Sequence, residues 1–263
     1  MVLVRDVVKY LELLAPLALA EEWDNVGLLM GDPSLSIESI MTCLTLTDET
    51  VEEAQDRSVQ LVVTHHPLPF RPMNRITVET TAGRLIWRLA SSQIAVYSAH
   101  TSFDSAATGI NSQLADGLQL DEIQPLRAFS DGEPDVGGGR IGRLSVEMTL
   151  GELADRAKSF LGIPSIQYVG DLDRQVRTVA VACGGADEFL TDAIAQQCDV
   201  FLTGEARFHT CIQAMANHVS MLLPGHFASE RFSVEQMATQ LANAFPDLAI
   251  WAAEREQDPL RTL

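Results

Sequence analysis

Histidines and carboxylates occur at three positions where the sequence predicts the end of a buried strand. At the first position, the apolar run LVVT is followed by His65, His66 and a proline. Neutral imidazoles are good ligands for Zn, Fe, Mn and Ni, so each ring could hold one ion of a metal pair. Histidines that cap the strand or lie on the surface would give the same pattern, and this pair alone leaves both interpretations open.

The second position is the segment HTSFD, which follows the apolar run IAVYSA. Asp104 could bridge two ions through its two carboxylate oxygens. His100 precedes it by four residues, and one turn of helix would place both side chains on the same face. We interpret His100 as a group that supports a ligand or carries a proton, rather than as a ligand itself.

The third position is the segment GHFASER, which follows the apolar run SMLLP. His226 and Glu230 are again four residues apart, so they would project together if a helix begins there. Polar pairs at this spacing also occur on many exposed helices, and the motif is weak by itself.

Together, the three segments supply enough nitrogen and oxygen donors for two divalent ions. Two ions about 3.5–4 Å apart can hold a bridging hydroxide. This mixed set of donors does not select one metal among Zn, Fe, Mn and Ni. The predicted ligands are His65, His66, Asp104, His226 and Glu230.

Two other strand ends carry weaker candidates. Cys183-Gly184-Gly185 lies between a predicted strand and a helix, where backbone amides could hold a phosphate, although a tight turn would look the same. The segment TGEARFH places Glu205 and His209 at another strand end. Glu205 could face a substrate, and a polar rim of the sheet is the alternative.

The N-terminal region ends in a third weak candidate. The N-terminal segment MVLVRDVVKYLELLAPLALAEEWD carries charged residues at helix-like spacing, which indicates an amphipathic helix. Trp23, Asp24 and Asn25 lie at its end, ahead of an apolar stretch with glycines. Asp24 and Asn25 could form hydrogen bonds behind the metal ligands, and a turn that ends the helix explains them equally well.

Two stretches of the chain, Ser39–Pro67 and Val179–Glu205, match in order and in pattern. Aligned without a gap, they place Asp48 on Asp187. Each reads as an apolar strand, an acidic helix start, an amphipathic helix and a second apolar strand, which is a βαβ unit with parallel strands. The HTSFD and GHFASER segments follow at equivalent places, so we predict an internal duplication.

The predicted fold is α/β (α+β), with two similar, intertwined domains. Each domain is expected to contain a mixed, largely parallel sheet flanked by helices. The first would comprise residues 1–125 and 226–263 and carry most of the metal ligands, and the second would comprise residues 126–225. The Gly-, Pro- and Asp-rich segment Ser130–Arg140 is predicted to be a loop or boundary between the two copies.

Composition argues against several classes of protein. Of the 263 residues, 46% are hydrophobic, which is typical of a packed globular protein. A net charge of −18 without a Lys/Arg cluster argues against binding to nucleic acid or anionic membranes. No apolar run is long enough to span a membrane, and the N-terminal segment has no cleavage site, so we expect a cytoplasmic location. The four cysteines form no CxxC pair and are expected to be reduced thiols.

Seven segments spread along the chain, which are named at the end of this paragraph, resemble those of the NIF-three-like family. Members of this family are often labelled GTP cyclohydrolase 1 type 2 homologues. The resemblance extends from residue 23 to residue 260. Three positions depart from the family's pattern: Thr64 replaces a common serine, Phe103 replaces a common leucine, and CGG stands where Gly-x-Gly is expected. The matching segments are WDNVGLLMGDP, THHPL, AHTSFD, the strand–CGG–helix unit, DVFLTGEARFH, GHFASER and EQDPL.

The resemblance implies a dinuclear metal centre with the five ligands named above, and therefore two divalent ions per subunit as cofactors. It also implies two intertwined α/β domains and a toroidal homohexamer whose metal sites face an inner cavity. The departure at CGG puts a phosphate-binding role of that turn in doubt.

The family label implies a metal-dependent hydrolase of the GTP cyclohydrolase type, in which activated water opens the imidazole ring of a purine nucleotide. His100 or Glu205 would carry protons in such a reaction. A phosphoester or an amide would suit the same site, because fold and metals do not choose the substrate. The alternative is a non-catalytic metal-binding regulator, metal chaperone or interaction scaffold.

Overall fold

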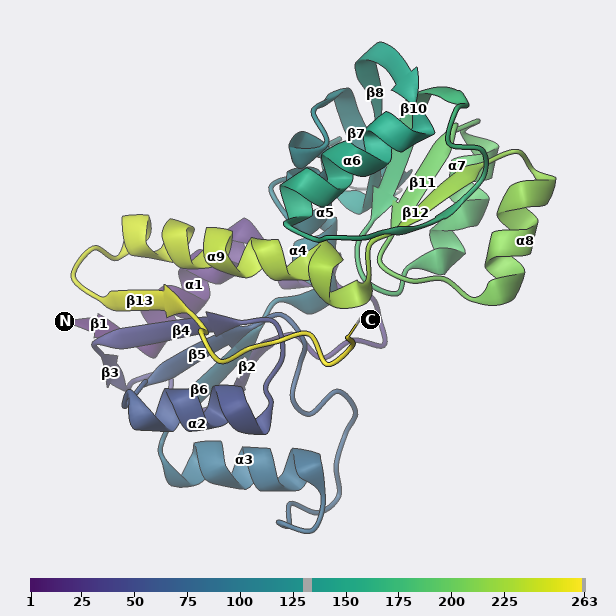
Figure 1. Cartoon of the computed structure of the whole chain (residues 1–263). Coiled ribbons are helices and arrows are strands. Elements are labelled where there is room, and N and C mark those ends of the chain that lie inside the picture. Colours follow the sequence, from purple (N-terminus) through teal and green to yellow (C-terminus); the bar gives the residue numbers. More distant parts are fainter. Residues whose placement is uncertain (130–133, 262–263) are drawn as a thin grey trace. The chain divides into compact units, whose positions relative to one another are not determined.

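The computed structural model describes residues 1–129 and 134–261. Contacts divide the chain into two compact units, each with its own large sheet (Figure 1). Unit 1 comprises residues 1–103 and 233–263, and unit 2 comprises residues 104–232. The division into domains 1–125 with 226–263 and 126–225, which we expect from the sequence, stays a prediction.

Unit 1 contains a five-stranded sheet and a separate pair of strands. The five-stranded order is β13-β4-β5-β6-β2, in which the first four strands are parallel and β2 runs antiparallel at the edge. Every residue of β4, β5 and β6 is buried, as expected for parallel strands with both faces covered. The strands are β1 (Val2–Leu3), β2 (Gly27–Met30), β3 (Ser36–Ile37), β4 (Ser39–Cys43), β5 (Leu61–Thr64), β6 (Ala95–Ser98) and β13 (Ala249–Ala252).

Helices connect these strands. The predicted N-terminal amphipathic helix is confirmed in the first part of its segment as α1, which buries Val4, Val7 and Leu11. The predicted βαβ unit is confirmed as β4–α2–β5, with its two strands parallel. The helices are α1 (Val4–Leu14), the 3-10 helix η1 (Leu17–Leu19), α2 (Asp48–Asp56), α3 (Thr81–Ser91), α4 (His100–Ser105), which leads into unit 2, and α9 (His226–Ala244), which leads back.

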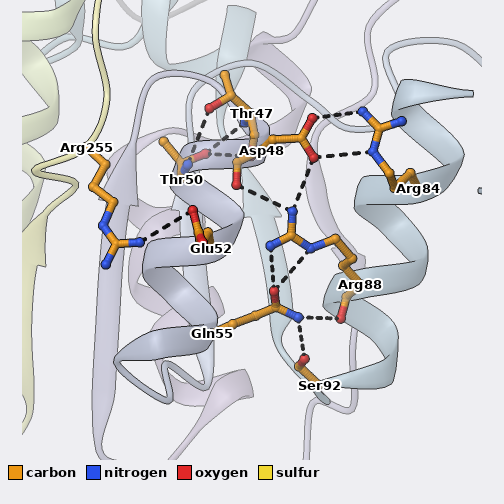
Figure 2. A network of polar contacts seen from close by, with 9 residues as sticks. All are labelled: Thr47, Asp48, Thr50, Glu52, Gln55, Arg84, Arg88, Ser92 and Arg255. Carbon is orange, nitrogen blue, oxygen red and sulfur yellow. Dashed lines mark hydrogen bonds and ion pairs between the residues drawn. The ribbon is translucent and has the colours of Figure 1, made fainter.

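A polar network joins α2 to α3 (Figure 2). The hydroxyl of Thr47 caps α2 by accepting a hydrogen bond from the amide of Thr50. Asp48 follows, and its carboxylate accepts two hydrogen bonds from Arg84 at 2.8 and 3.3 Å and a third from Arg88 at 3.2 Å. The hydrogen bond from Arg84 lowers the pKa of Asp48. The acidic helix start seen in the sequence therefore also fastens the two crossover helices together.

Unit 2 contains a six-stranded sheet with the order β7-β8-β10-β11-β12-β9. The strands β10, β11 and β12 are parallel, and β8 and β9 run antiparallel on either side of them. The strands are β7 (Leu120–Ala128), β8 (Gly137–Thr149), β9 (Gln167–Val169), β10 (Gln175–Ala182), β11 (Val200–Thr203) and β12 (Ser220–Leu223).

The second predicted βαβ unit is confirmed in unit 2, where a 3-10 turn and a short helix connect the parallel strands β10 and β11.

Even α9, with 19 residues, is too polar to be a membrane helix, and no other helix in the described residues is long and apolar enough to cross a bilayer. The remaining helices are α5 (Ile110–Gly117), α6 (Leu150–Leu161), η2 (Asp187–Phe189), α7 (Leu190–Ala195) and α8 (Phe208–Ala216).

The segment Ser130–Arg140, predicted to be a boundary loop, is partly a strand. Residues 137–140 belong to β8, whereas residues 130–133 lie outside the described part of the chain. A β-carbon on Gly138 would lie 2.6 Å from the ring of Phe189. The glycines here therefore allow close packing inside a sheet, and interpreting them as loop residues was wrong for residues 137–140.

The two units share a topology. Each has three parallel strands joined by two helical crossovers, and an antiparallel strand pairs with the third. Each also joins its two crossovers with an acid–arginine pair, Asp48 with Arg84 in unit 1 and Asp187 with Arg207 in unit 2. The predicted class, mixed α/β sheets flanked by helices, is confirmed. The likeness of the units supports the duplication, which stays a prediction.

Candidate metal centre

His65 and His66 stand directly after β5, at the strand end where the sequence places them. Their amides extend the bonding pattern of the sheet, donating to the carbonyls of Cys43 at 3.0 Å and Leu44 at 2.8 Å. The hydroxyl of Thr45 lies 2.7 Å from Nδ1 of His66. Because Thr45 engages Nδ1, Nε2 is the atom of His66 that would hold an ion.

A third imidazole joins this pair within unit 1. The ring centroid of His100 lies 5.1 Å from that of His65 and 5.6 Å from that of His66, and the last two lie 5.1 Å apart. One nitrogen of each ring lies within 4.8 Å of the other two. The His65 side chain is buried, and the hydroxyl of Ser98 donates to its carbonyl at 2.6 Å. Unit 1 therefore gathers three imidazoles just after β5 and β6.

Asp24 orients His100. Oδ1 of Asp24 lies 2.7 Å from Nδ1 of His100, and Thr101 donates to Oδ2 through its amide at 3.1 Å and its hydroxyl at 2.5 Å. Burial by itself would raise the pKa of Asp24, but the hydrogen bonds from His100 and Thr101 outweigh burial and lower the pKa to about 2. A carboxylate behind an imidazole fixes the ring and its tautomer, both in metal ligands and in general bases.

The sequence left open whether Asp24 and Asn25 form hydrogen bonds behind the candidate ligands or only a turn that ends the helix, and the structure shows different roles for the two residues. Asp24 forms hydrogen bonds behind the histidine cluster, whereas Asn25 donates to the carbonyl of Pro69 at 2.8 Å. His100 begins α4 with a φ of 21°, a value that few non-glycine residues adopt. Such a backbone persists only where its surroundings hold it, and here the Asp24 carboxylate does so.

In unit 2, α9 begins at His226, so the helix that the HxxxE spacing needs is present. Nε2 of His226 lies 3.2 Å from Oε2 of Glu230, one turn later, and Oε1 of Glu205 lies 3.0 Å from Nδ1 of the same ring. The hydrogen bond to Glu230 raises the pKa of His226 to about 9, against the opposing effect of burial, and Glu205 adds to the rise. The two carboxylates therefore favour positive charge at this position, which a protonated ring or a metal ion can supply.

The turn Cys183-Gly184-Gly185 makes room for Glu230. A β-carbon on Gly184 would lie 2.2 Å from Oε1 of Glu230, and Gly184 has a φ of +65° that also favours glycine. Its amide donates to the hydroxyl of Ser229 at 2.9 Å, and the amide of Cys183 likewise donates to a side chain of unit 2. Because these two amides are used inside the unit, neither is available to a phosphate.

Asp104 is held by Cys183 and Asn111, and no local pattern in the sequence indicates this role for either residue. The thiol of Cys183 donates to Oδ1 of Asp104 at 3.4 Å. The Asn111 side chain donates to the carbonyl of Asp104 at 3.1 Å and accepts from the amide of Cys183 at 2.8 Å. Burial, and then the charges of Asp104 and Glu230, raise the pKa of the Cys183 thiol. The protonated thiol thus acts as a donor to a candidate ligand.

Glu205 and His209, which one segment brings to the same strand end, have different surroundings. Glu205 lies against His226. His209 is exposed on α8, with its ring centroid 5.7 Å from that of Phe208. Within residues 1–129 and 134–261, no contact links His209 to a candidate metal ligand.

The profile of one protein family, Duf34/NIF3 (NGG1p interacting factor 3), matches residues 2–259. The chain belongs to the NIF3 family. The resemblance to this family is thereby confirmed over almost the whole length of the chain.

Relatives of this NIF3-family chain align with it nearly end to end. A protein of Clostridium acetobutylicum, named GTP cyclohydrolase 1 type 2 homolog, is 34% identical over 94% of this chain and 92% of its own. A Schizosaccharomyces pombe protein, named Protein NIF3 homolog, is 32% identical over 93% of this chain and 92% of its own. The crystal structure of a Bacillus cereus protein related to NIF3 has a TM-score of 0.91 at 22% identity, covering 100% and 99% of the two chains, and shows the same fold.

The side chains of this family member fit divalent metal ions. Imidazole nitrogens and carboxylate oxygens are donors that Zn, Fe, Mn and Ni accept. The glycine at 184 leaves the Glu230 carboxylate a space that any other residue would fill. The predicted ligands fall into two groups, His65 and His66 in unit 1 and Asp104, His226 and Glu230 in unit 2.

Proposed function

We propose that this NIF3-family chain is a metal-dependent hydrolase of the GTP cyclohydrolase 1 type 2 kind, which opens a purine nucleotide ring or hydrolyses a related substrate. The cluster of His65, His66 and His100, with Asp24 behind it, carries the proposal. A buried carboxylate that orients an imidazole next to two candidate metal ligands suits proton transfer during hydrolysis. The name of the clostridial relative supports the same chemistry.

In this proposal two divalent ions per subunit are the cofactors, drawn from Zn, Fe, Mn and Ni. When bound, such ions would polarise a substrate group and lower the pKa of a water molecule. His65 and His66 would contribute imidazole nitrogens, and Asp104, His226 and Glu230 would contribute the remaining donors. The cradle that Gly184 leaves for Glu230 supports this set of ligands.

His100 and Glu205 are the proposed proton carriers. Because Asp24 engages Nδ1 of His100, proton uptake and release take place at Nε2. The ionised Asp24 stabilises the protonated ring while the proton is held. The Glu205 side chain is 60% exposed, so its carboxylate is open to a substrate while it also orients His226.

Turnover by protein of defined metal content tests the proposal. Protein reconstituted separately with Zn, Fe, Mn and Ni should convert GTP or a related nucleotide, detected as a change in purine absorbance, and metal-free protein should not. Asp104→Ala should abolish turnover and lower the bound metal below two ions per subunit. Asp155→Ala, which changes an exposed carboxylate on α6, should alter neither. No turnover across a broad panel of nucleotides and phosphoesters would reject the hydrolase.

A non-catalytic role is the second candidate, as a metal-binding regulator, a metal chaperone or an interaction scaffold. Two observations favour it: the family description refers to an interacting factor, and a net charge of −18 repels free nucleotides over a distance. Rapid transfer of metal to an acceptor protein, without turnover of any substrate, would favour the metal chaperone. Retrieval of one dominant partner whether or not metal is present would favour the scaffold.

The assembly and location are further proposals. We propose a toroidal homohexamer in the cytoplasm, without nucleic-acid or membrane partners. Light scattering should then give about six times the subunit mass of 28.7 kDa. A monomer or dimer at micromolar concentration would reject the hexamer.

A further inference from the structure

Two large aromatic side chains, Trp23 and Phe70, lie exposed beside His100. Trp23 is 59% exposed and Phe70 is 46% exposed. Their ring centroids lie 5.8 Å apart with the planes tilted by 43°, and each ring lies 5.9 Å from the imidazole of His100. Neighbouring aromatic rings of this size leave much apolar area in water, which indicates a surface that another molecule covers.

Hydrogen bonds hold the segments that carry these rings. The side chain of Asn25, two residues after Trp23, donates to the carbonyl of Pro69, the residue before Phe70, at 2.8 Å. The amide of Asn25 donates to Oδ1 of Asp24 at 2.8 Å, and the amide of Glu21 donates to the hydroxyl of Thr101 at 3.0 Å. The two rings and the imidazole therefore belong to one hydrogen-bonded framework within unit 1.

We propose that Trp23 and Phe70 bind the planar heteroaromatic ring of the substrate next to His100. A planar base stacks on an aromatic side chain through its π-face, without requiring charge. A ring held there would lie beside the imidazole that is proposed to carry the proton. The inference rests on the proposed function and deepens it, because it selects a heteroaromatic compound over a simple phosphoester or an aliphatic amide.

Recognition through the base is compatible with the charge of the protein. With a net charge of −18, the surface as a whole does not attract an anionic nucleotide. Uncharged rings can recognise the base of a nucleotide where long-range electrostatics oppose its phosphates. A second protein chain is the other occupant that exposed aromatic residues can accept, because tryptophan is frequent at the centre of protein interfaces.

Equilibrium binding separates this inference from turnover. Metal-reconstituted protein should be titrated calorimetrically with guanosine, which lacks phosphate, and with ribose 5-phosphate, which lacks the base. We expect guanosine to bind more tightly, and Trp23→Ala to weaken its binding about tenfold. Trp23→Phe, which keeps a ring, should retain most of the affinity. Trp87→Ala is the matched control, because Trp87 is 57% exposed on α3 and should not affect binding.

The outcomes distinguish the inference from the function on which it rests. Ring-dependent guanosine binding without any turnover would support the inference and count against the hydrolase. Turnover with an unchanged KM in both Trp23→Ala and Phe70→Ala would support the hydrolase and overturn the inference. Equal affinity of the wild-type protein for ribose 5-phosphate and guanosine would also overturn the inference. So would a Trp23→Ala variant that binds guanosine as tightly as the wild type but forms a smaller oligomer in light scattering, because the rings would then serve a protein interface. Metal content measured in each variant, and Phe70→Ala as an independent substitution, keep the test valid if Trp23→Ala folds poorly.

Discussion

The thiol of Cys183 donates a hydrogen bond to Oδ1 of Asp104 over 3.4 Å, inside unit 2. The residue after Cys183 is the glycine whose missing side chain makes room for Glu230. One turn of the chain therefore orients one candidate ligand through its thiol and makes space for another. This explains a Cys-Gly-Gly turn at the end of β10 without a bound phosphate.

Cys183→Ala should weaken metal binding about tenfold, because a hydrogen bond behind a ligand fixes its orientation. Cys183→Ser, which restores a donor, should recover most of the affinity. Competition with a chelator of known affinity measures the change. Cys211→Ala, in a half-buried position of the same unit, is the control. Equal affinities in Cys183→Ala and the wild type would show that Asp104 is oriented by other groups.

Gly184→Ala should abolish high-affinity metal binding, since its β-carbon would lie 2.2 Å from Oε1 of Glu230. Gly162→Ala is a matched control, because Gly162 has a φ of +67° with nothing within 4 Å of the added carbon. Because alanine disfavours the left-handed backbone that Gly162 adopts, the control should lose only about 1–2 kcal/mol of unfolding free energy. Chemical denaturation and metal analysis of both variants separate the clash from the backbone effect. Normal metal binding by Gly184→Ala would remove Glu230 from the ligands.

Metal binding should strengthen as the pH rises from 6 to 9. In the metal-free protein His226, with a pKa of about 9, carries a proton that an incoming ion must displace. The apparent affinity should rise by up to about tenfold per pH unit and level off near pH 9. Calorimetry in two buffers of different ionisation enthalpy measures the released proton. A pH-independent affinity without proton release would exclude His226 as a ligand.

The same group has the opposite effect on the stability of the metal-free protein. Its pKa is raised above the ordinary value of 6.5, so the protonated ring stabilises the fold fully below pH 6.5. This contribution is lost as the pH rises towards 9. Without metal the unfolding free energy should therefore fall over this interval, whereas with saturating metal the tighter binding offsets that fall and keeps it nearly constant.

Asp24→Asn should lower the unfolding free energy at neutral pH by about 2 kcal/mol, because the variant loses an ionised acceptor whose pKa is about 2 in the folded protein. A lowered carboxyl pKa stabilises the fold above pH 4, and that contribution is lost as the pH falls through 2. The difference between wild type and variant should shrink over this acidic interval. Asp155→Asn, at an exposed carboxylate on α6, is the control. A difference that does not change with pH would contradict the ionised Asp24–His100 pair.

Much of the fold could be predicted from local patterns. Apolar runs followed by glycine, proline or acidic residues marked β4, β5, β10 and β11 and the helices between them, because strand burial and helix starts leave a short-range pattern. The same reasoning failed at Gly137–Arg140, where the glycines allow close packing within the sheet and Gly138 packs against Phe189. Composition alone cannot tell a flexible loop from a strand that has no space for side chains.

The candidate ligands lie at or shortly after the ends of predicted strands, and their role as ligands stays a prediction. Their partners could not be predicted, because the contacts join residues that are far apart in the chain. Asp24 and His100 are separated by 76 residues, and Asp104 and Cys183 by 79. No local spacing records such a pair.

The amino-acid sequence by itself determined which donor types end the strands, the acidic charge that argues against nucleic acid, and the alternation of strand and helix. Only the tertiary structure decided that Asp24 engages His100, that Glu205 rather than His209 contacts His226, and that Trp23 and Phe70 lie beside the histidine cluster. The reason is physical: periodicity along a chain reports which side chains are buried, whereas the packing of a whole unit sets which distant side chains touch.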